Sequence, residues 1–379
     1  MKYSLNTILI LLLLSVYACD DPDDVSFEEE TREIDWQTAA DSSSNALVDN
    51  FWNSSDKYFN YGNTGNTDFH YWPQAHALDV LIDAYLRTGD SFYKGYIDQW
   101  YEGVPVKNGG NFINDFYDDM EWNGLAMLRA YEVTGDNKFK EGTDQVWEDI
   151  KMGWNETAGG GIAWQKNMLQ YKNTPANAPA SILASRLYNQ FGNEADKEWA
   201  LKIYDWLKSN LFDAGTGFVY DGMNRNSDMA KDNWEFTYNQ GVFIGAALEL
   251  YNITNEAVYL NDAIKAADYA LNVHTNSTDR VLKDEGSGDG GLFKGIFIRY
   301  FTQLILHPDL AEGTKKRYVN FLYHNAETLW LDGTNRNGVL FGTYWATQPG
   351  SSVDLTVETS GAMLIEAAAL LEDEGLNVD

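Results

Sequence analysis

The chain has 379 residues, 44% of them hydrophobic, which is enough for a large core in one big domain or two ordinary ones. Its formal net charge of −30 argues against nucleic acid as a partner, because phosphate binding needs a basic surface. The same charge disfavours a polyuronate substrate, so we expect a neutral ligand. Aromatic residues make up 14% of the chain, which suits carbohydrate binding as well as core packing.

Residues 1–33 are predicted to lie outside the fold. Residues 1–18 hold an apolar run, Ile8 to Leu14, that is typical of a secretory signal peptide and too short to span a membrane. Cys19 is the only cysteine, which excludes a disulfide within one chain and favours lipid attachment; an incidental cysteine is the alternative. Residues 19–33 include the acidic run DDPDD, resemble the start of surface lipoproteins of Bacteroidetes, and are predicted to form a flexible tether. We expect an exported protein that contacts the outer membrane, at the cell surface, only through this anchor.

From Trp36 onward the apolar residues recur at helical spacing, and the pattern predicts about twelve helices. Their expected spans are 36–52, 73–87, 91–102, 117–133, 137–153, 176–191, 195–210, 236–252, 256–274, 292–306, 312–330 and 358–373. A turn recurs, in which a helix ends shortly after a tyrosine and the next residue type suits a positive φ. These turn positions are Gly89, Gly135, Gly192 and Asn255.

Alternate helices differ in composition. The first, third and later odd helices carry a charged face, as in TDQVWEDIKMGW, which indicates an outer position. The even helices are rich in small and apolar residues, as in NAPASILASRLY, which indicates burial on most sides. Outer and inner helices that alternate in this way predict that residues 34–379 form one all-α domain, an (α/α)6 barrel with short loop strands near 160–164 and 217–222. An open α-solenoid is the alternative.

The inner helices of such a barrel run in the same direction, so the segments that enter them meet at one rim. One of these segments, NDFYDDMEWN, holds the adjacent acids Asp118 and Asp119, and Asp115 is predicted to cap the helix that follows. A pair of acids before a helix is usually a cap or a solvated surface. Two carboxylates among aromatic rings are also what glycosidic cleavage requires. Their position on a rim of polar and aromatic loops favours catalysis.

Five motifs, FYDDMEW, GGGIAW, KNTPANAPA, FTYNQG and FKGIFIRY, occur in this order and resemble glycoside hydrolase family 76, the bacterial endo-α-1,6-mannanases. The resemblance spans residues 36–379 and implies an (α/α)6 barrel, retention of anomeric configuration, and no metal or other cofactor. It implies that Asp118 is the nucleophile and Asp119 the general acid/base. Neighbouring side chains can also reach the ~5–5.5 Å separation of a retaining pair, which favours retention independently.

Further rim residues are predicted to contact the substrate, although each also has a structural interpretation as core, helix cap or salt-bridge partner. They are Trp72, His76, Trp122, Trp164, Asn177, Tyr238, Asn239, Gln240 and Lys294. The histidines and the cysteine show no spacing typical of zinc ligands. DEGSGDGG at 284–291 lacks the glutamate spacing of an EF-hand, so we interpret it as a loop over the cleft, with calcium binding as the alternative.

We therefore expect an endo-acting retaining glycoside hydrolase that cleaves α-1,6-mannosidic linkages in mannan backbones or manno-oligosaccharides, and that acts as a monomer. Two other functions stay open. A non-catalytic surface glycan-binding lipoprotein would share the aromatic rim but would have no use for the acid pair. A transglycosylase of the same family would use the same residues, and the sequence does not distinguish it.

Overall fold

The computed structural model describes residues 34–377. The predicted signal peptide, Cys19 and the acidic tether lie outside the described residues. Within the described range, twelve α-helices follow one another along the chain, joined by loops that carry two-residue strands. The odd-numbered helices are α1 (Trp36–Phe51), α3 (Ser91–Lys107), α5 (Asn137–Met152), α7 (Glu194–Leu211), α9 (Ala257–Val273) and α11 (Glu312–Leu331). The even-numbered helices are α2 (Tyr71–Thr88), α4 (Tyr117–Thr134), α6 (Ala178–Phe191), α8 (Thr237–Thr254), α10 (Gly290–Leu306) and α12 (Leu355–Asp373).

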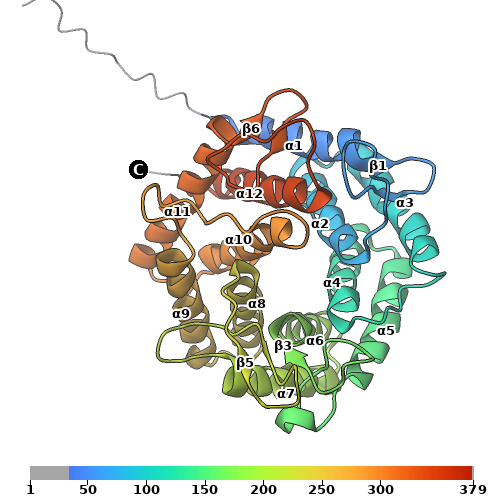
Figure 1. The fold of residues 1–379 in the computed structure, drawn as a ribbon, viewed down its shortest axis with the longest axis vertical. Helices are drawn as coiled ribbons and strands as arrows, with labels where there is room; N and C mark the ends of the chain where they lie inside the picture. Colours follow the sequence, from blue (N-terminus) through green and yellow to red (C-terminus); the bar gives the residue numbers. More distant parts are fainter. Residues whose placement is uncertain (1–33, 378–379) are drawn as a thin grey trace, which may run out of the picture. The chain divides into compact units, whose positions relative to one another are not determined.

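The even-numbered helices form a closed inner ring. Each of them packs against the next, and α12 returns to pack against α2. The odd-numbered helices lie outside this ring, each against one or two inner helices (Figure 1). The contact between α12 and α2 excludes the open solenoid, and the predicted (α/α)6 barrel is confirmed.

The composition of each helix explains its layer. Helix α8 buries residues on every side, as an inner helix must when it contacts both ring neighbours and an outer partner. Helix α5 buries only the stripe that includes Phe139, Val146 and Ile150, and its charged residues face outward. The predicted boundaries hold to within a few residues, except that α3 continues to Lys107.

The predicted turns are confirmed in detail. At the four turn positions the backbone adopts the left-handed conformation, and each N–H donates to the carbonyl four residues earlier. Three glycines accept this conformation without steric cost, and asparagine tolerates it better than most residues. The φ values are 67° at Gly89, 69° at Gly135, 70° at Gly192 and 58° at Asn255.

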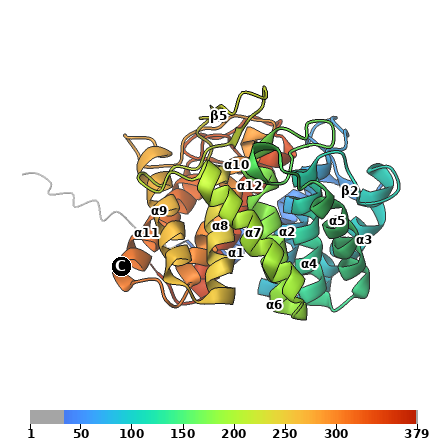
Figure 2. The same ribbon diagram turned by 90° about the horizontal axis from the view of Figure 1, so that it is seen from below.

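The two ends of the barrel differ. The end where the inner helices begin carries long loops and is called the loop end; the opposite end, closed by these tight turns, is called the turn end (Figure 2). Two two-stranded sheets pair β1 (Trp52–Asn53) with β2 (Tyr58–Phe59) and β6 (Thr334–Asn335) with β7 (Leu340–Phe341). In a three-stranded sheet, β4 (Gly222–Met223) lies between β3 (Lys172–Asn173) and β5 (Lys231–Asp232). In residues 34–377 we find no helix that combines the length and apolarity needed to cross a membrane.

Candidate active site

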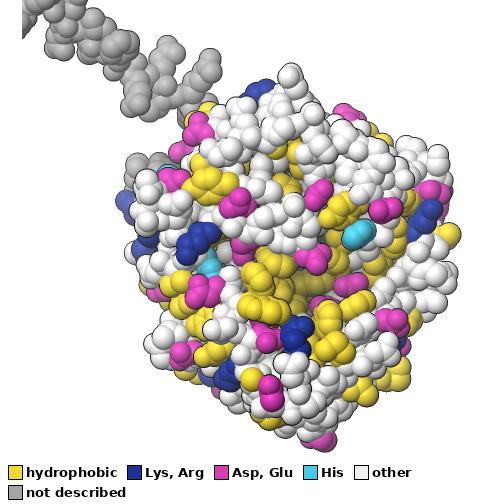
Figure 3. Space-filling model, viewed as in Figure 1, with side chains coloured by type: hydrophobic (Ala, Val, Ile, Leu, Met, Phe, Trp, Pro, Cys, Tyr) yellow, Lys and Arg dark blue, Asp and Glu magenta, His cyan; other side chains and the backbone are white. Residues whose placement is uncertain are grey.

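A cleft of about 600 Å³ opens at the loop end. Its walls come from the first turns of α2, α4, α8 and α10 and from the loops around β3, β4 and β5. Figure 3 shows hydrophobic side chains gathered around a hollow on this face, with acidic side chains among them. The lining residues are His70, Trp72, Phe116, Asp118, Asp119, Trp122, Trp164, Tyr171, Asn173, Pro175, Asp221, Arg225, Trp234, Phe236, Tyr238, Asp289 and Phe293.

Asp118 and Asp119 occupy the first turn of α4 and both line the cleft. The helix is capped by the backbone of Phe116, without a side-chain hydrogen bond, so the prediction that Asp115 caps α4 is wrong. The helix therefore does not use either member of the acid pair, or Asp115, as its cap. Both adjacent carboxyl groups remain available to the cleft.

The two carboxyl groups have different surroundings. Asp118 accepts hydrogen bonds from Trp164 Nε1 at 3.1 Å and from the backbone N–H of Asp119 at 3.2 Å. Burial raises the pKa of Asp118 to about 7, while these donors oppose the rise. Among the described residues no group donates to the Asp119 carboxyl, and burial followed by the charges of Asp118 and Asp289 raises its pKa well above the usual range. Asp118 therefore ionises first and Asp119 keeps its proton to higher pH.

The loop 160–164 places Trp164 against Asp118. Gly161 has a φ of 87°, and a Cβ there would lie 2.8 Å from the ring of Trp206, so only glycine fits this approach. The buried Lys172 donates to the Gly161 carbonyl at 2.7 Å. The Trp164 carbonyl in turn accepts the first N–H of α4, from Tyr117, at 3.0 Å. The glycine-rich motif thus fixes the donor that stabilises ionised Asp118.

Asn177 also supports this loop and does not contact the cleft. Its side chain is fully buried, accepts the Ile162 N–H at 2.8 Å and donates to the Ile162 carbonyl at 3.0 Å. It makes no side-chain cap on α6. The predicted substrate contact of Asn177 is contradicted, because its amide is consumed by the backbone of the GGGIAW loop.

A third carboxylate, Asp221, lies on the opposite wall. It accepts hydrogen bonds from the hydroxyls of Tyr238 at 2.7 Å and Tyr171 at 3.1 Å, and from the Asn239 side chain at 3.1 Å. Burial raises its pKa, and these donors oppose the rise. Sequence reasoning missed Asp221, because GFVYDG was interpreted only as a strand signal. The donor residues of FTYNQG would have pointed to a missing acceptor.

Four of the aromatic residues that are predicted to contact the substrate lie in the cleft wall. Trp72, Trp122, Trp164 and Tyr238 line the cleft as expected. His76 instead lies behind the wall, with its ring centroid 5.6 Å from that of Trp72 and 5.0 Å from that of Trp122. Burial lowers the pKa of His76 to about 3, so the ring is neutral and supports the two tryptophans. Its predicted contact with substrate is contradicted.

Three further predicted contacts are also contradicted. Asn239 reaches the cleft only through Asp221. Gln240 is fully buried and holds the loop before β4, accepting the Val219 N–H at 2.7 Å. Lys294 donates to the Thr343 carbonyl, away from the cleft, and burial lowers its pKa to about 8. Gln240 and Lys294 thus satisfy loop backbone groups that would otherwise be buried without partners, and Asn239 bonds to a cleft carboxylate.

Several cleft residues were not predicted at all. Trp234, Phe236 and Phe293 add flat apolar faces, and Phe293 stacks on Tyr238 at 4.1 Å. The Arg225 guanidinium lies over the Tyr171 ring at 4.0 Å. Most of these unpredicted cleft residues lie in loops whose conformation depends on tertiary contacts. Within residues 34–377, no cluster of three or more His, Cys, Asp or Glu side chains is arranged to hold a metal ion.

Comparison with known proteins adds independent findings. A family model described as Glycosyl hydrolase family 76 matches residues 35–377. The α-1,6-mannanase GH76A from Salegentibacter sp. HEL1_6 is 45% identical, with a TM-score of 0.86 over 89% of this chain and 100% of that chain. A solved variant of that enzyme, described as inactive, has two consecutive aspartates replaced by alanine and is in complex with α-1,6-mannotetrose; it is 44% identical, with the same TM-score and coverage.

A curated relative is also similar. Mannan endo-1,6-α-mannosidase DCW1 of Candida glabrata is 30% identical over 227 residues, which are 52% of this chain and 50% of that protein. The chain thus spans about half the length of this fungal relative.

Proposed function

This chain belongs to glycosyl hydrolase family 76, and we propose that it is an endo-acting α-1,6-mannanase that hydrolyses mannan backbones with retention of configuration. The observation that carries the proposal is the unlike environment of two adjacent carboxyl groups in an aromatic cleft. One is held by hydrogen-bond donors and ionises first, and the other is protonated and unpartnered among the described residues. These are the states that a nucleophile and a general acid need.

The Salegentibacter enzyme supports the assignment of this pair. Its inactive variants change two consecutive aspartates. Between residues 35 and 377, where the family matches, consecutive aspartates occur in this sequence only at Asp118 and Asp119. The fold similarity at 45% identity makes this pair the natural counterpart.

In the proposed mechanism Asp118 attacks the anomeric carbon and Asp119 gives its proton to the departing glycosidic oxygen. The bond from carbon to the leaving oxygen breaks as the ester to Asp118 forms. Asp119, now ionised, removes a proton from the water that attacks the same carbon and releases Asp118. Two inversions give net retention. Trp164 Nε1 stabilises the Asp118 carboxylate both before attack and when it leaves.

The remaining lining positions the sugar. Trp72, Trp122 and Trp234 offer apolar faces to the C–H side of mannose rings. Asp221 accepts three hydrogen bonds and, as a carboxylate with about four acceptor sites, can accept one more from a sugar hydroxyl. A neutral, hydroxyl-rich substrate fits this lining and the net charge of −30.

Linear α-1,6-mannan tests the proposal, with released reducing ends and product sizes as the readout. The wild type should release a series of oligosaccharides, and Asp118→Ala and Asp119→Ala should each lose turnover. An aryl manno-oligoside with a good leaving group separates the roles. Asp119→Ala should regain rapid release of the aryl group in the first step, because that leaving group needs no protonation, although the second step stays slow without the base. Asp118→Ala should stay inactive in both steps. The opposite pattern would exchange the roles, and normal mannan cleavage by either variant would refute the mechanism.

We further infer from the sequence that the protein is exported and anchored through a lipid on Cys19. The described residues support a consistent geometry, because Gln37 at the start of α1 donates to the Ala369 carbonyl at the end of α12, at 2.9 Å. Helix α1 therefore begins at the turn end, opposite the cleft. Labelling with a radioactive fatty acid should mark the wild type and not Cys19→Ser; equal labelling would refute the anchor.

A further inference from the structure

A second hollow, of about 810 Å³, lies at the loop end between the segments that follow α9 and precede α12. We call it the rim hollow, and its lining includes Asn276, Ser287, Tyr344, Gln348 and Asp354. It shares no lining residue with the cleft. Its lining combines amides and hydroxyls with apolar side chains, a partly exposed aromatic ring, and the charged side chains of Lys283 and Asp284. Hydrogen-bonding groups beside an apolar ring are the chemistry that binds a neutral sugar.

One short loop forms a wall of both cavities. Ser287 lines the rim hollow and Asp289 lines the cleft, with only Gly288 between them. The Gly288 N–H donates to Asp354 at 3.1 Å, and Trp72 Nε1 in the cleft donates to Asp289 at 3.1 Å. The rim hollow and the cleft therefore lie on either side of this loop.

Buried side chains hold residues 341–344, which form one wall of the rim hollow. Lys294 donates to the Thr343 carbonyl, and Glu358, fully buried, accepts the Phe341 N–H at 3.1 Å. The Tyr344 hydroxyl donates to Asp279 and orients the ring. A wall that is already ordered loses little conformational freedom when a ligand binds. Lys294, which does not line the cleft, thus has a structural role in the wall of the rim hollow.

We propose that the rim hollow binds mannosyl units of the substrate that are remote from the cleaved linkage, with the Tyr344 ring as their stacking surface. The proposal rests on the proposed mannanase function and extends it to substrate selection. The remote units belong either to the continuing α-1,6 backbone or to a side branch, because both present the same hydroxyls and the same C–H face. Long or branched mannans are then better substrates than short linear ones.

The test compares wild type, Tyr344→Ala and Tyr344→Phe on three substrates: α-1,6-mannotetraose, long linear α-1,6-mannan and side-branched mannan. Both variants lose the bond to Asp279, but only Tyr344→Ala loses the ring, so Tyr344→Phe is the matched control. We expect Tyr344→Ala to lose about tenfold in kcat/KM on long or branched substrates and little on the tetraose. Tyr344→Phe should stay close to wild type on all three.

Each outcome has one meaning. A loss on long linear mannan assigns the hollow to the backbone, and a loss confined to branched mannan assigns it to a branch. Equal activity of Tyr344→Ala and wild type on all three, or an equal loss that includes the tetraose, overturns the rim-hollow proposal alone. A folded wild type that cleaves none of the three overturns the proposed function and this inference together. Thermal unfolding of each variant identifies losses due to misfolding, and Gln348→Ala then tests the same wall without touching Tyr344.

Discussion

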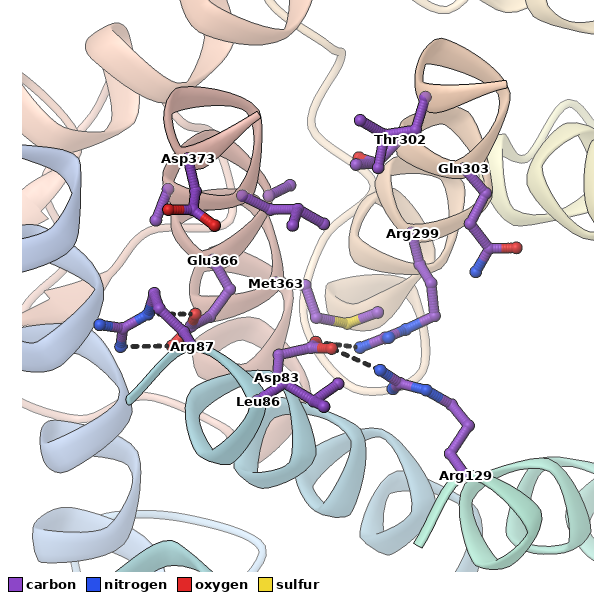
Figure 4. A pocket seen from close by; sticks show the side chains of 14 residues that line it. Asp83, Leu86, Arg87, Arg129, Arg299, Thr302, Gln303, Met363, Glu366 and Asp373 are labelled. Carbon is purple, nitrogen blue, oxygen red and sulfur yellow. Dashed lines mark hydrogen bonds and ion pairs between the residues drawn. The ribbon is translucent and has the colours of Figure 1, made fainter. Parts of the chain in front are cut away.

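Asp79, in an ion-pair network of the inner helices, and the carboxylates of the cleft have pKa values that shift in opposite directions. Toward the turn end, midway along α2, Asp79 is bonded by Arg129 and lies 3.5 Å from Arg299, and its pKa is lowered although burial opposes the shift. Figure 4 shows Arg299 and Arg129 converging on Asp83 there from α10 and α4, at 2.9 and 2.6 Å. At the loop end, Asp118, Asp119 and Asp221 have no cation within ion-pair distance among the described residues, and their pKa values are raised.

The difference lies in the partners, because both groups of carboxylates are buried. Guanidinium groups at the turn end pair with these carboxylates and join α2, α4, α10 and α12, which helps to close the ring. The pKa of Glu366, which Arg87 bonds, is nevertheless raised, because burial outweighs the pairing there. At the loop end the carboxylates accept hydrogen bonds only from neutral donors, so the pair of Asp118 and Asp119 retains one proton at neutral pH. The turn end thus stabilises the fold, and the loop end keeps a reactive arrangement that costs stability.

The largest expected effect is the difference in kcat between variants that lack the Asp118 carboxylate and variants that lack the Asp79 carboxylate. Asp118→Asn should lower kcat on α-1,6-mannan by at least about 10⁴-fold, because the nucleophile is lost while the shape is kept. Asp79→Asn, the matched change at the turn end, should leave kcat per folded molecule near wild type. Rates normalised to folded protein decide between them. Comparable losses of kcat in both variants would show that Asp118 and Asp79 do not differ in their importance for catalysis.

Removing a cation at the turn end should mainly affect stability. Arg129→Ala leaves Asp79 and Asp83 short of a partner, and we expect the free energy of unfolding to fall by about 3–5 kcal/mol. Arg317→Ala is the control, because its pair with Asp268 is exposed and should contribute about 0–1 kcal/mol. Urea unfolding followed by circular dichroism measures both. Equal, small losses would mean that the turn-end network does not stabilise the ring.

The pH dependence of stability should have opposite signs at the two ends. The folded-state pKa of Asp119 is raised, so ionisation in the unfolded chain costs stability above about pH 4. Asp119→Asn should therefore raise the free energy of unfolding at about pH 8 and have little effect near pH 4. The folded-state pKa of Asp79 is lowered, so its stabilisation is present above about pH 4 and lost below it.

For Asp79→Asn we expect destabilisation at about pH 8 that fades as the pH falls. Unfolding curves for both variants across the pH range provide the measurement. If both variants change stability in the same direction at about pH 8, the electrostatic contrast between the ends is wrong.

The smallest expected effect concerns the donor to Asp118. Trp164→Phe removes the indole N–H, so the pKa of Asp118 should rise further and the acidic limb of kcat/KM should move up by about one pH unit or less. Trp72→Phe is the control, because its N–H donates to Asp289 instead. Both changes keep an aromatic face in the cleft. A pH profile unchanged by Trp164→Phe would remove this tryptophan from the control of ionisation.

Much of the fold could be predicted because local sequence patterns indicate it. Helical periodicity, turns such as the one at Gly89, and the alternation of charged and apolar helices are properties of short segments. They were enough to predict the barrel. The acid pair was also found locally, since adjacency is visible in sequence. Five predicted contacts failed, as His76, Asn177, Asn239, Gln240 and Lys294 lie behind the wall. A polar residue near a rim looks the same in sequence whether it contacts ligand or loop backbone.

By itself, the sequence determined the helix order, the alternation of inner and outer helices and the position of Asp118 and Asp119 at the start of an inner helix, whereas the contact between α12 and α2 showed that the ring is closed. Only the tertiary structure decided which acid ionises first, because Trp164, Asp221 and Asp289 come from segments far apart in the chain. It also decided that Lys294 fixes the wall of the rim hollow. Periodicity reflects burial within one segment, whereas a pKa depends on charges, donors and solvent exclusion that distant segments bring together.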